Sequence, residues 1–243
     1  MMRLSRGVIA VLPALLLSPL ASPAAGRQGP IRVACVGDSI TLGTGAGPGQ
    51  SYPAQLGRML GPRWQVANFG VGGTTMLRQG DRPYWDTSAF RDVAAFRPAV
   101  VIIMLGTNDS KPWNWRHREH FVADYRAMVE VYSRLPGKPR VFCCLPPPVA
   151  GRGNGGINEP VILEQIPRIK KVAGRTKAEI LDMHAPLTEC LEVLTDNVHP
   201  NAVGAARLAR TAYKALVGKE FEGDVPPPRR GRAGIPKPED VAH

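Results

Sequence analysis

Residues 100–105 read Val-Val-Ile-Ile-Met-Leu, an apolar run of strand length in which polar residues do not alternate with apolar ones. A strand that is apolar on both faces is typical of a parallel sheet covered by helices on each side. Four further runs complete a set of candidate strands, at residues 31–36, 64–68, 140–145 and 179–183.

Segments with helical spacing of apolar residues lie between and after these strands. Residues 121–132 place six apolar side chains on one face of a helix, and residues 208–216 place five on one face near the end of the chain. The alternation predicts an α/β fold. We expect a three-layer α/β/α sandwich around a five-stranded, doubly wound parallel sheet.

The first 26 residues have the features of an export signal. Arg3 and Arg6 precede a short apolar stretch at 8–17, and small residues follow at 21–26. The stretch is shorter than the ~20 residues of a membrane span. It predicts a signal peptide at 1–26, export to the periplasm or the exterior, and no stable membrane anchor after cleavage. An uncleaved anchor is the alternative.

The rest of the chain has the length of a single α/β domain, which we place at residues 27–221. Residues 222–243 are rich in proline and arginine and poor in apolar residues, so they are predicted to form a disordered tail.

The net charge of the 243 residues is +11, and the basic residues are scattered without a long run or an aromatic-interleaved patch. We therefore expect no nucleic-acid partner. The four cysteines, Cys35, Cys143, Cys144 and Cys190, match neither a zinc site nor a dense disulfide framework. Three of them lie in apolar runs, where we expect small buried side chains. Whether any of them pair is left open.

Four polar clusters stand where the predicted topology places ligands. Three follow the first three strands, Gly-Asp-Ser-Ile-Thr at 37–41, Asn-Phe-Gly-Val-Gly-Gly at 68–73 and Gly-Thr-Asn-Asp at 106–109. The fourth, Asp-Asn-Val-His at 196–199, precedes the last helix. Each alone could be an ordinary turn or helix cap. Together they offer a nucleophile, two oxyanion donors and an acid-histidine pair.

This combination resembles the SGNH (GDSL-type) serine hydrolases, whose four sequence blocks carry Ser, Gly, Asn and His. The resemblance implies the SGNH hydrolase fold, which is flavodoxin-like, and assigns a role to each matching position. Ser39 would be the nucleophile, and its own N–H would serve the oxyanion hole. Gly73, with Gly72 as a substitute, and Asn108 would be the other oxyanion donors. His199 would be the general base and Asp196 the acid that orients it.

Further stretches resemble a bacterial branch labelled sialate O-acetylesterase-like or carbohydrate esterase: SYPAQL (51–56), GDRPYW (80–85), IMLGTNDSKPWNW (103–115), LPPPV (145–149), GINE (156–159) and VHPNA (198–202). The resemblance implies a secreted esterase that hydrolyses short-chain esters, above all O-acetyl groups on carbohydrates. An O-acyltransferase, a lysophospholipase or thioesterase, and a silent carbohydrate-binding module are the alternatives. The acyl group, the glycan or alcohol, and the oligomeric state stay open.

Candidate substrate contacts are Asp38, Trp113 and Trp115. Tryptophan near such a site can stack on a sugar, or it can simply pack a loop against the domain. His117 and His120 lack HExxH spacing, and the glycines at 43–49 lack the lysine of a phosphate loop. We therefore expect no metal and no cofactor, and a small-molecule or glycan ester as the partner.

Overall fold

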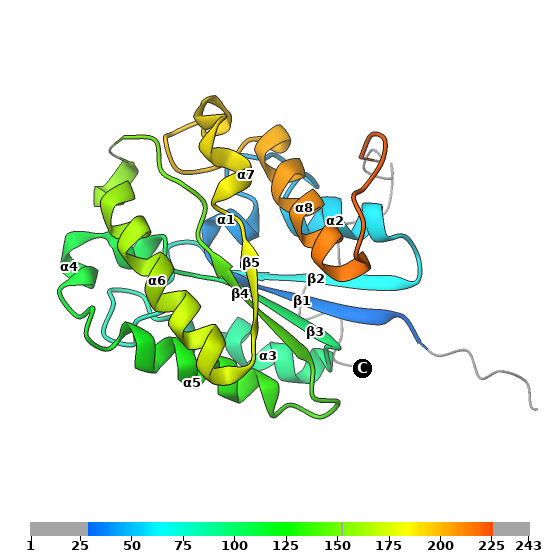
Figure 1. The fold of residues 1–243 in the computed structure, drawn as a ribbon, viewed down its shortest axis with the longest axis horizontal. Helices are drawn as coiled ribbons and strands as arrows, with labels where there is room; N and C mark the ends of the chain where they lie inside the picture. Colours follow the sequence, from blue (N-terminus) through cyan, green and yellow to red (C-terminus); the bar gives the residue numbers. More distant parts are fainter. Residues whose placement is uncertain (1–28, 152, 226–243) are drawn as a thin grey trace, which may run out of the picture.

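The computed structural model describes residues 29–151 and 153–225. Its five strands are β1 (Ile31–Gly37), β2 (Trp64–Gly70), β3 (Val100–Met104), β4 (Arg140–Leu145) and β5 (Glu179–Asp182). They form one sheet in the order β2-β1-β3-β4-β5, and every neighbouring pair is parallel (Figure 1). The predicted fold class is confirmed, and each strand begins at the residue expected.

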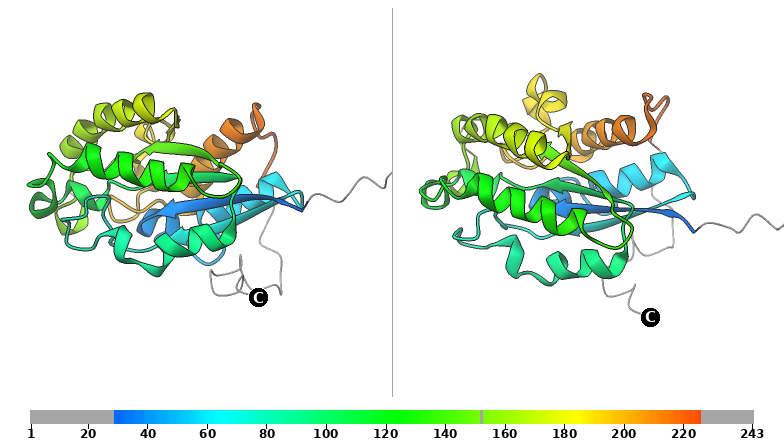
Figure 2. Two further views of the ribbon diagram at one scale, coloured as in Figure 1. Left: turned by 90° about the horizontal axis from the view of Figure 1, so that it is seen from below. Right: turned by 60° about the horizontal axis from the view of Figure 1, so that its bottom comes forward.

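Helices cover both faces of this sheet, as Figure 2 shows. On one face lie α2 (Tyr52–Leu60), α7 (Ala185–Thr188) and α8 (Ala202–Val217), and on the other lie α3 (Ser88–Phe96), α5 (Phe121–Ser133) and α6 (Glu159–Thr176). Two one-turn helices, α1 (Ser39–Leu42) and α4 (Pro112–Trp115), occupy loops after strands. Single 3-10 turns lie at Tyr84–Asp86, Asn108–Ser110, Asn154–Gly156 and Leu191–Val193.

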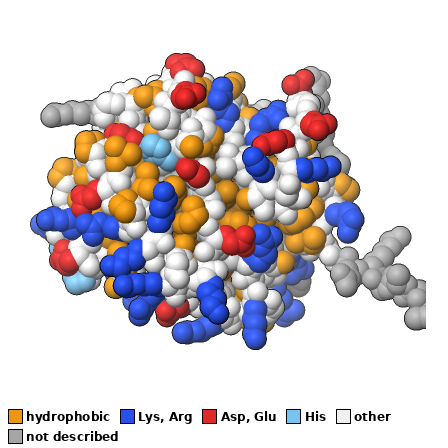
Figure 3. All heavy atoms as spheres, viewed as in Figure 1, with side chains coloured by type: hydrophobic (Ala, Val, Ile, Leu, Met, Phe, Trp, Pro, Cys, Tyr) orange, Lys and Arg blue, Asp and Glu red, His pale blue; other side chains and the backbone are white. Residues whose placement is uncertain are grey.

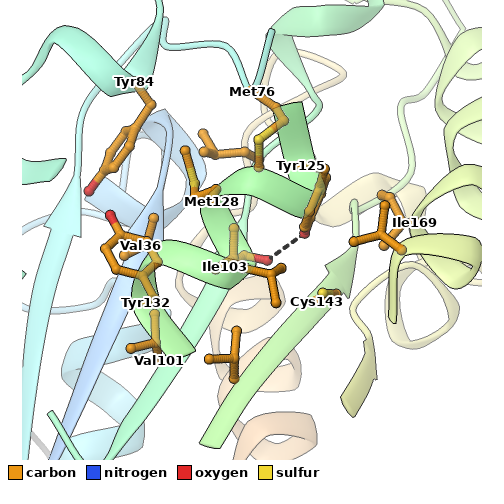
Figure 4. Packing of buried hydrophobic residues seen from close by; sticks show 14 of the residues in the cluster. Val36, Met76, Tyr84, Val101, Ile103, Tyr125, Met128, Tyr132, Cys143 and Ile169 are labelled. Carbon is orange, nitrogen blue, oxygen red and sulfur yellow. Dashed lines mark hydrogen bonds between the residues drawn. The ribbon is translucent and has the colours of Figure 1, made fainter. Parts of the chain in front are cut away.

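The apolar run that predicted the fold forms the centre of both core layers. All five residues of β3 are buried. Val101 and Ile103 pack with α3, α5 and α6, while Ile102 packs with α2 and α8. Figure 4 shows the first layer, where the Tyr125 hydroxyl donates to the Ile103 carbonyl at 3.1 Å. A strand with two buried faces needs this continuous apolar pattern.

The last helix begins six residues before the predicted segment. Asn201 caps α8, and its side-chain oxygen accepts from the N–H groups of Val203 and Gly204. The apolar spacing did not predict this first turn, because its apolar residue Val203 is 60% exposed and so does not continue the buried face of the helix. Asparagine at the cap position carries the signal instead.

The predicted signal peptide (1–26) and residues 226–243 of the predicted tail lie outside the described residues. The described part of that tail contacts α8, because Arg210 donates to the Gly223 carbonyl at 2.6 Å. The ordered chain therefore extends past residue 221. In the part of the chain that the structure describes, no helix has the length and apolar character needed to cross a membrane.

All four cysteines are buried and none forms a disulfide. The expectation of small buried side chains is therefore confirmed. On the surface, lysine and arginine side chains are spread among acidic ones over the face seen in Figure 3.

The contact between α8 and the sheet predicts a sharp contrast between two positions of that helix. Leu208 is fully buried, so Leu208→Ala should lower the free energy of unfolding by about 2–5 kcal/mol. Val203→Ala, on the exposed side of the same helix, should change it by less than about 0.5 kcal/mol. Chemical denaturation of both variants measures this, and equal losses would contradict the packing described.

Candidate active site

Ser39 stands in a tight turn at the carboxyl end of β1. β1 ends at Gly37 and α1 begins at Ser39, capped by Asp38, whose Oδ1 accepts from the Ile40 N–H at 3.0 Å. The end of β2 lies in close contact with this turn, since a Cβ at Gly70 would collide with the Leu42 backbone. Glycine at position 70 therefore lets the second strand approach the serine closely.

A chain of two short hydrogen bonds links Ser39 to the loop before α8. The Ser39 Oγ lies 2.8 Å from His199 Nε2, although 160 residues separate the two. On the other side of the ring, His199 Nδ1 lies 2.6 Å from Asp196 Oδ2. The predicted Ser, His and Asp are thus brought together in the order that nucleophilic catalysis requires.

The loop around Asp196 fixes the carboxylate as well as the ring. Its Oδ1 accepts from the N–H groups of Val198 and His199 at 3.1 and 2.8 Å, and Asn197 adopts a left-handed φ of 68°. Burial opposes ionisation of Asp196, but the bonds from the His199 ring and these N–H groups outweigh it and lower its pKa. An ionised Asp196 favours the tautomer with a proton on Nδ1, which leaves Nε2 free to accept from Ser39.

The predicted oxyanion donors lie on the loops after β2 and β3. A Cβ at Gly72 would lie 3.9 Å from the Ser39 Cβ, so the 72–73 segment borders the nucleophile. Gly73 adopts a φ of 78°, and its N–H has no hydrogen-bond partner among the described residues. Asn108 is buried, with 4% of its surface exposed, and its Nδ2 donates to the Thr74 carbonyl at 3.1 Å.

Three supporting residues had no role in the sequence analysis. Asn68 ties β2 to the nucleophile turn, because its Nδ2 donates to the Thr41 carbonyl at 2.8 Å. Asp109 is fully buried and accepts from the N–H groups of Met76 and Leu77. Asn114 donates to the Asn108 carbonyl at 2.9 Å. All three lie within the motifs at 68–73 and 103–115, so their place in these motifs could have indicated a supporting role.

The three predicted substrate contacts differ in accessibility. Asp38 is 1% exposed and caps α1, so the structure gives it a capping role, and its contact with a substrate stays a prediction. Trp115 is 6% exposed and packs on Phe121, which favours the alternative in which its ring packs a loop against the domain, and a role in binding stays a prediction. Trp113 is 46% exposed, and its Nε1 donates to Asp81 Oδ2 at 2.8 Å, so it remains a candidate wall for a ligand.

Histidine, cysteine, aspartate and glutamate side chains do not gather in groups of three or more suited to a metal ion within the described ranges. The absence of a metal or cofactor from the reaction stays a prediction.

Comparison with known proteins identifies the family. Residues 35–207 match the GDSL-like lipase/acylhydrolase family, a span that contains all four sequence blocks and both ends of the Ser39–His199 bond. The chain belongs to this family. The resemblance to GDSL-type hydrolases drawn from the sequence is confirmed.

Two curated relatives of this GDSL-like chain are esterases by name. An acetylxylan esterase from Xylanibacter ruminicola is 38% identical over 218 residues, which cover 81% of this chain and 45% of that protein. A multidomain esterase from Ruminococcus flavefaciens is 25% identical over 140 residues, which cover 55% of this chain and 17% of that protein. The chain therefore spans less than half the length of the curated relatives it matches.

Solved structures share the fold of this GDSL-like domain. A carbohydrate acetylesterase from Sinorhizobium meliloti superposes with a TM-score of 0.63 at 22% identity, covering 77% of this chain and 98% of that one. A mutant acetyl-xylooligosaccharide esterase from a Geobacillus species gives 0.60 at 22% identity, covering 82% and 99%. At these identities the similarity establishes the fold alone.

The buried carboxyl groups beside the site predict how stability depends on pH. Burial raises the pKa of Asp38 to about 6 and that of Asp109 to about 7, although backbone N–H groups oppose the shift in both. A raised carboxyl pKa means that the folded state keeps the carboxyl proton up to a higher pH than the unfolded chain does. The resulting contribution to the free energy of unfolding is fully present below about pH 4 and is lost as pH rises through about 7.

The free energy of unfolding should therefore fall between about pH 4.5 and 7, as denaturation at a series of pH values would measure. In Asp109→Asn, which removes one of the two titrating groups, the fall should be shallower. Asp86→Asn, at an exposed aspartate, is the matched control. A stability that rises across this window in the wild type, or an unchanged slope in Asp109→Asn, would contradict the assignment.

Proposed function

We propose that this protein is a serine esterase that removes short-chain acyl groups, above all acetyl, from carbohydrates. The observation that carries the proposal is the pair of hydrogen bonds that join Ser39 to His199 at 2.8 Å and His199 to Asp196 at 2.6 Å, beside the loops after β2 and β3. Family membership supports ester hydrolysis as the reaction class.

In the first step, Ser39 Oγ attacks the ester carbonyl carbon and His199 Nε2 takes the hydroxyl proton. The carbonyl oxygen becomes an oxyanion, which the N–H groups of Ser39 and Gly73 and the Asn108 amide would stabilise. The Ser39 N–H is suited to this because the first N–H groups of a helix have no intrahelical partner. Donors aimed at the developing charge are usually the largest single contribution to such catalysis.

Collapse of this intermediate breaks the bond to the alcohol oxygen, which leaves with the proton held by His199. An acyl group then remains on Ser39. In the second step a water molecule gives its proton to His199 and attacks the acyl carbon, and the Ser39 oxygen departs with that proton. Asp196 stays ionised throughout, and its charge stabilises the histidinium formed in each step.

Two observations support a carbohydrate as the alcohol part of the ester. The relative with 38% identity is named an acetylxylan esterase. In this chain, Trp113 offers a half-exposed ring held by its bond to Asp81, and Asp81 also accepts from Asn114, which donates to the Asn108 carbonyl. The ring is thereby tied to the loop of a proposed oxyanion donor. Aromatic rings of this kind suit the apolar faces of sugars.

We also propose that the protein acts outside the cytoplasm, as the signal-like pattern at residues 1–26 supports. The four cysteines do not bear on this proposal because all are buried and unpaired.

The decisive test is acetate release by the wild type and by Ser39→Ala, first from p-nitrophenyl acetate and butyrate and then from acetylated xylan, pectin and acetylated sialic acid. We expect serine-dependent turnover that is faster on acetate than on butyrate. Loss of the triad serine should lower kcat by at least about 1,000-fold, because only binding and the oxyanion donors remain.

The matched control is Ser133→Ala, since Ser133 lies at the end of α5 and its hydroxyl bonds only within that helix. Equal, slow release by the wild type and Ser39→Ala would refute the esterase. Release that requires an added sugar acceptor would instead identify an acyltransferase.

A further inference from the structure

Arg82 makes a direct contact with the loop that borders the nucleophile. It lies between β2 and the 3-10 turn at Tyr84–Asp86, and its Nη1 donates to the Gly72 carbonyl at 2.7 Å. The bond is short and charge-assisted, a class roughly twice as strong as bonds between neutral groups.

The atom that Arg82 holds belongs to the same peptide unit as a proposed oxyanion donor. The Gly72 carbonyl and the Gly73 N–H are the two polar groups of one planar, trans peptide, so they point in opposite directions. Fixing the oxygen therefore fixes the direction of the N–H. A cation on the oxygen also polarises the peptide and strengthens the N–H as a donor.

This peptide has little else to hold it. Both of its residues are glycines, which favour no single conformation, and Gly73 stands at a φ of 78°. Neighbouring backbone is anchored at Val71, whose N–H donates to the Gly37 carbonyl at 2.9 Å, and at Thr74, whose hydroxyl donates to the Val71 carbonyl at 2.8 Å. Among the described residues, Arg82 supplies the one side-chain hydrogen bond to the 72–73 peptide.

Arg82 is itself well placed to act as an anchor. Its carbonyl accepts from the Thr75 N–H at 2.9 Å, and the N–H of the preceding residue, Asp81, donates to Asn114 Oδ1 at 2.8 Å. Its Cδ would lie 3.8 Å from a Cβ at Gly73, so the stem of the side chain covers that glycine. Asn114 also donates to the Asn108 carbonyl, which links the anchor to the second donor loop.

No carboxylate of the described chain forms an ion pair with Arg82. The neighbouring Asp81 instead contacts Lys111, Trp113 and Asn114. Arg82 is exposed, so water competes for its bond to Gly72 in the free protein. A bound ester that excludes this water would strengthen the bond at the moment when the oxyanion forms.

We propose that Arg82 is a positioning residue that orients and polarises the Gly72–Gly73 peptide, so that the Gly73 N–H is aimed at the oxyanion. The proposal rests on the proposed function, since it takes Gly73 as an oxyanion donor. Arg82 acts through the peptide and does not touch the reacting atoms. It should therefore matter more for the transition state than for substrate binding.

The test compares the full-length wild type with Arg82→Ala, Arg82→Lys and Asn108→Ala, using p-nitrophenyl acetate. Arg82→Ala should lower kcat roughly 10- to 100-fold with little change in KM, less than the roughly 100- to 1,000-fold loss expected for removing a donor outright in Asn108→Ala. Arg82→Lys should recover part of the loss. Millimolar guanidinium should recover part of it in Arg82→Ala and none of it in Asn108→Ala.

The matched control is Arg32→Ala. Arg32 also donates to a backbone carbonyl, that of Phe96 at 3.1 Å, but it lies at the start of β1, away from the carboxyl ends of the strands. This variant should keep the wild-type kcat. A second measurement, independent of turnover, is the amide signal of Gly73 in a ¹H–¹⁵N spectrum, which should move in Arg82→Ala and stay in Arg32→Ala.

These outcomes separate the two proposals. A wild type without serine-dependent turnover would refute the proposed function, and the Gly73 signal would still decide whether Arg82 orients the peptide. A normal kcat in Arg82→Ala, a rise in KM alone, or an unmoved Gly73 signal would overturn the role of Arg82. If Arg82→Ala does not fold, the same kcat, KM and amide measurements on Arg82→Lys decide in the same way.

Discussion

The placement of β1 between β2 and β3 is the constraint on which the site depends. In a parallel sheet, the loops that follow the strands all begin at the same edge. In the order β2-β1-β3-β4-β5, β2 and β3 lie on opposite sides of β1. The loops after β2 and β3 therefore flank the turn that carries Ser39. This placement rests on apolar pairing inside the sheet, where Val33 of β1 lies opposite Val66 on one side and Val100 on the other. The strands thus position the turn that carries Ser39 and the two loops beside it, while His199 and Asp196 reach the site from the loop before α8.

A second layer of buried polar contacts converts this arrangement into a fixed geometry. Asn68 links the nucleophile turn to β2, Asp109 holds the backbone at 76–77, and Asn114 bridges the loops that carry Asn108 and Arg82. Each contact satisfies a backbone group that would otherwise be costly to bury. Because catalytic donors must be oriented before the reaction, such supporting bonds matter as much as the residues that meet the substrate.

The sequence was sufficient for the fold, because β1, β3 and β4 carry continuous apolar runs, which are typical of a parallel sheet covered by helices on both faces. The motifs next to strand and helix ends also predicted that Ser39, His199 and Asp196 act together, and hydrogen bonds join these three side chains in the structure, while the role of Asn108 stays a prediction. Burial could not be predicted. Trp113 and Trp115 look equivalent in sequence, yet α4 turns one ring outward and the other into the core. The capping role of Asp38 was not predicted, because a capping carboxylate and a binding one have the same local sequence.

The central claim, that Ser39 is an activated nucleophile, is most directly tested by mass spectrometry after exposure to a fluorophosphonate. Such reagents phosphonylate serine, with loss of fluoride, only where a neighbouring base withdraws the hydroxyl proton, as the 2.8 Å contact with His199 provides. We predict one adduct per chain, on the peptide containing Ser39, which is absent from His199→Ala and from heat-denatured protein. An adduct elsewhere, or no adduct on a folded chain, would contradict the account.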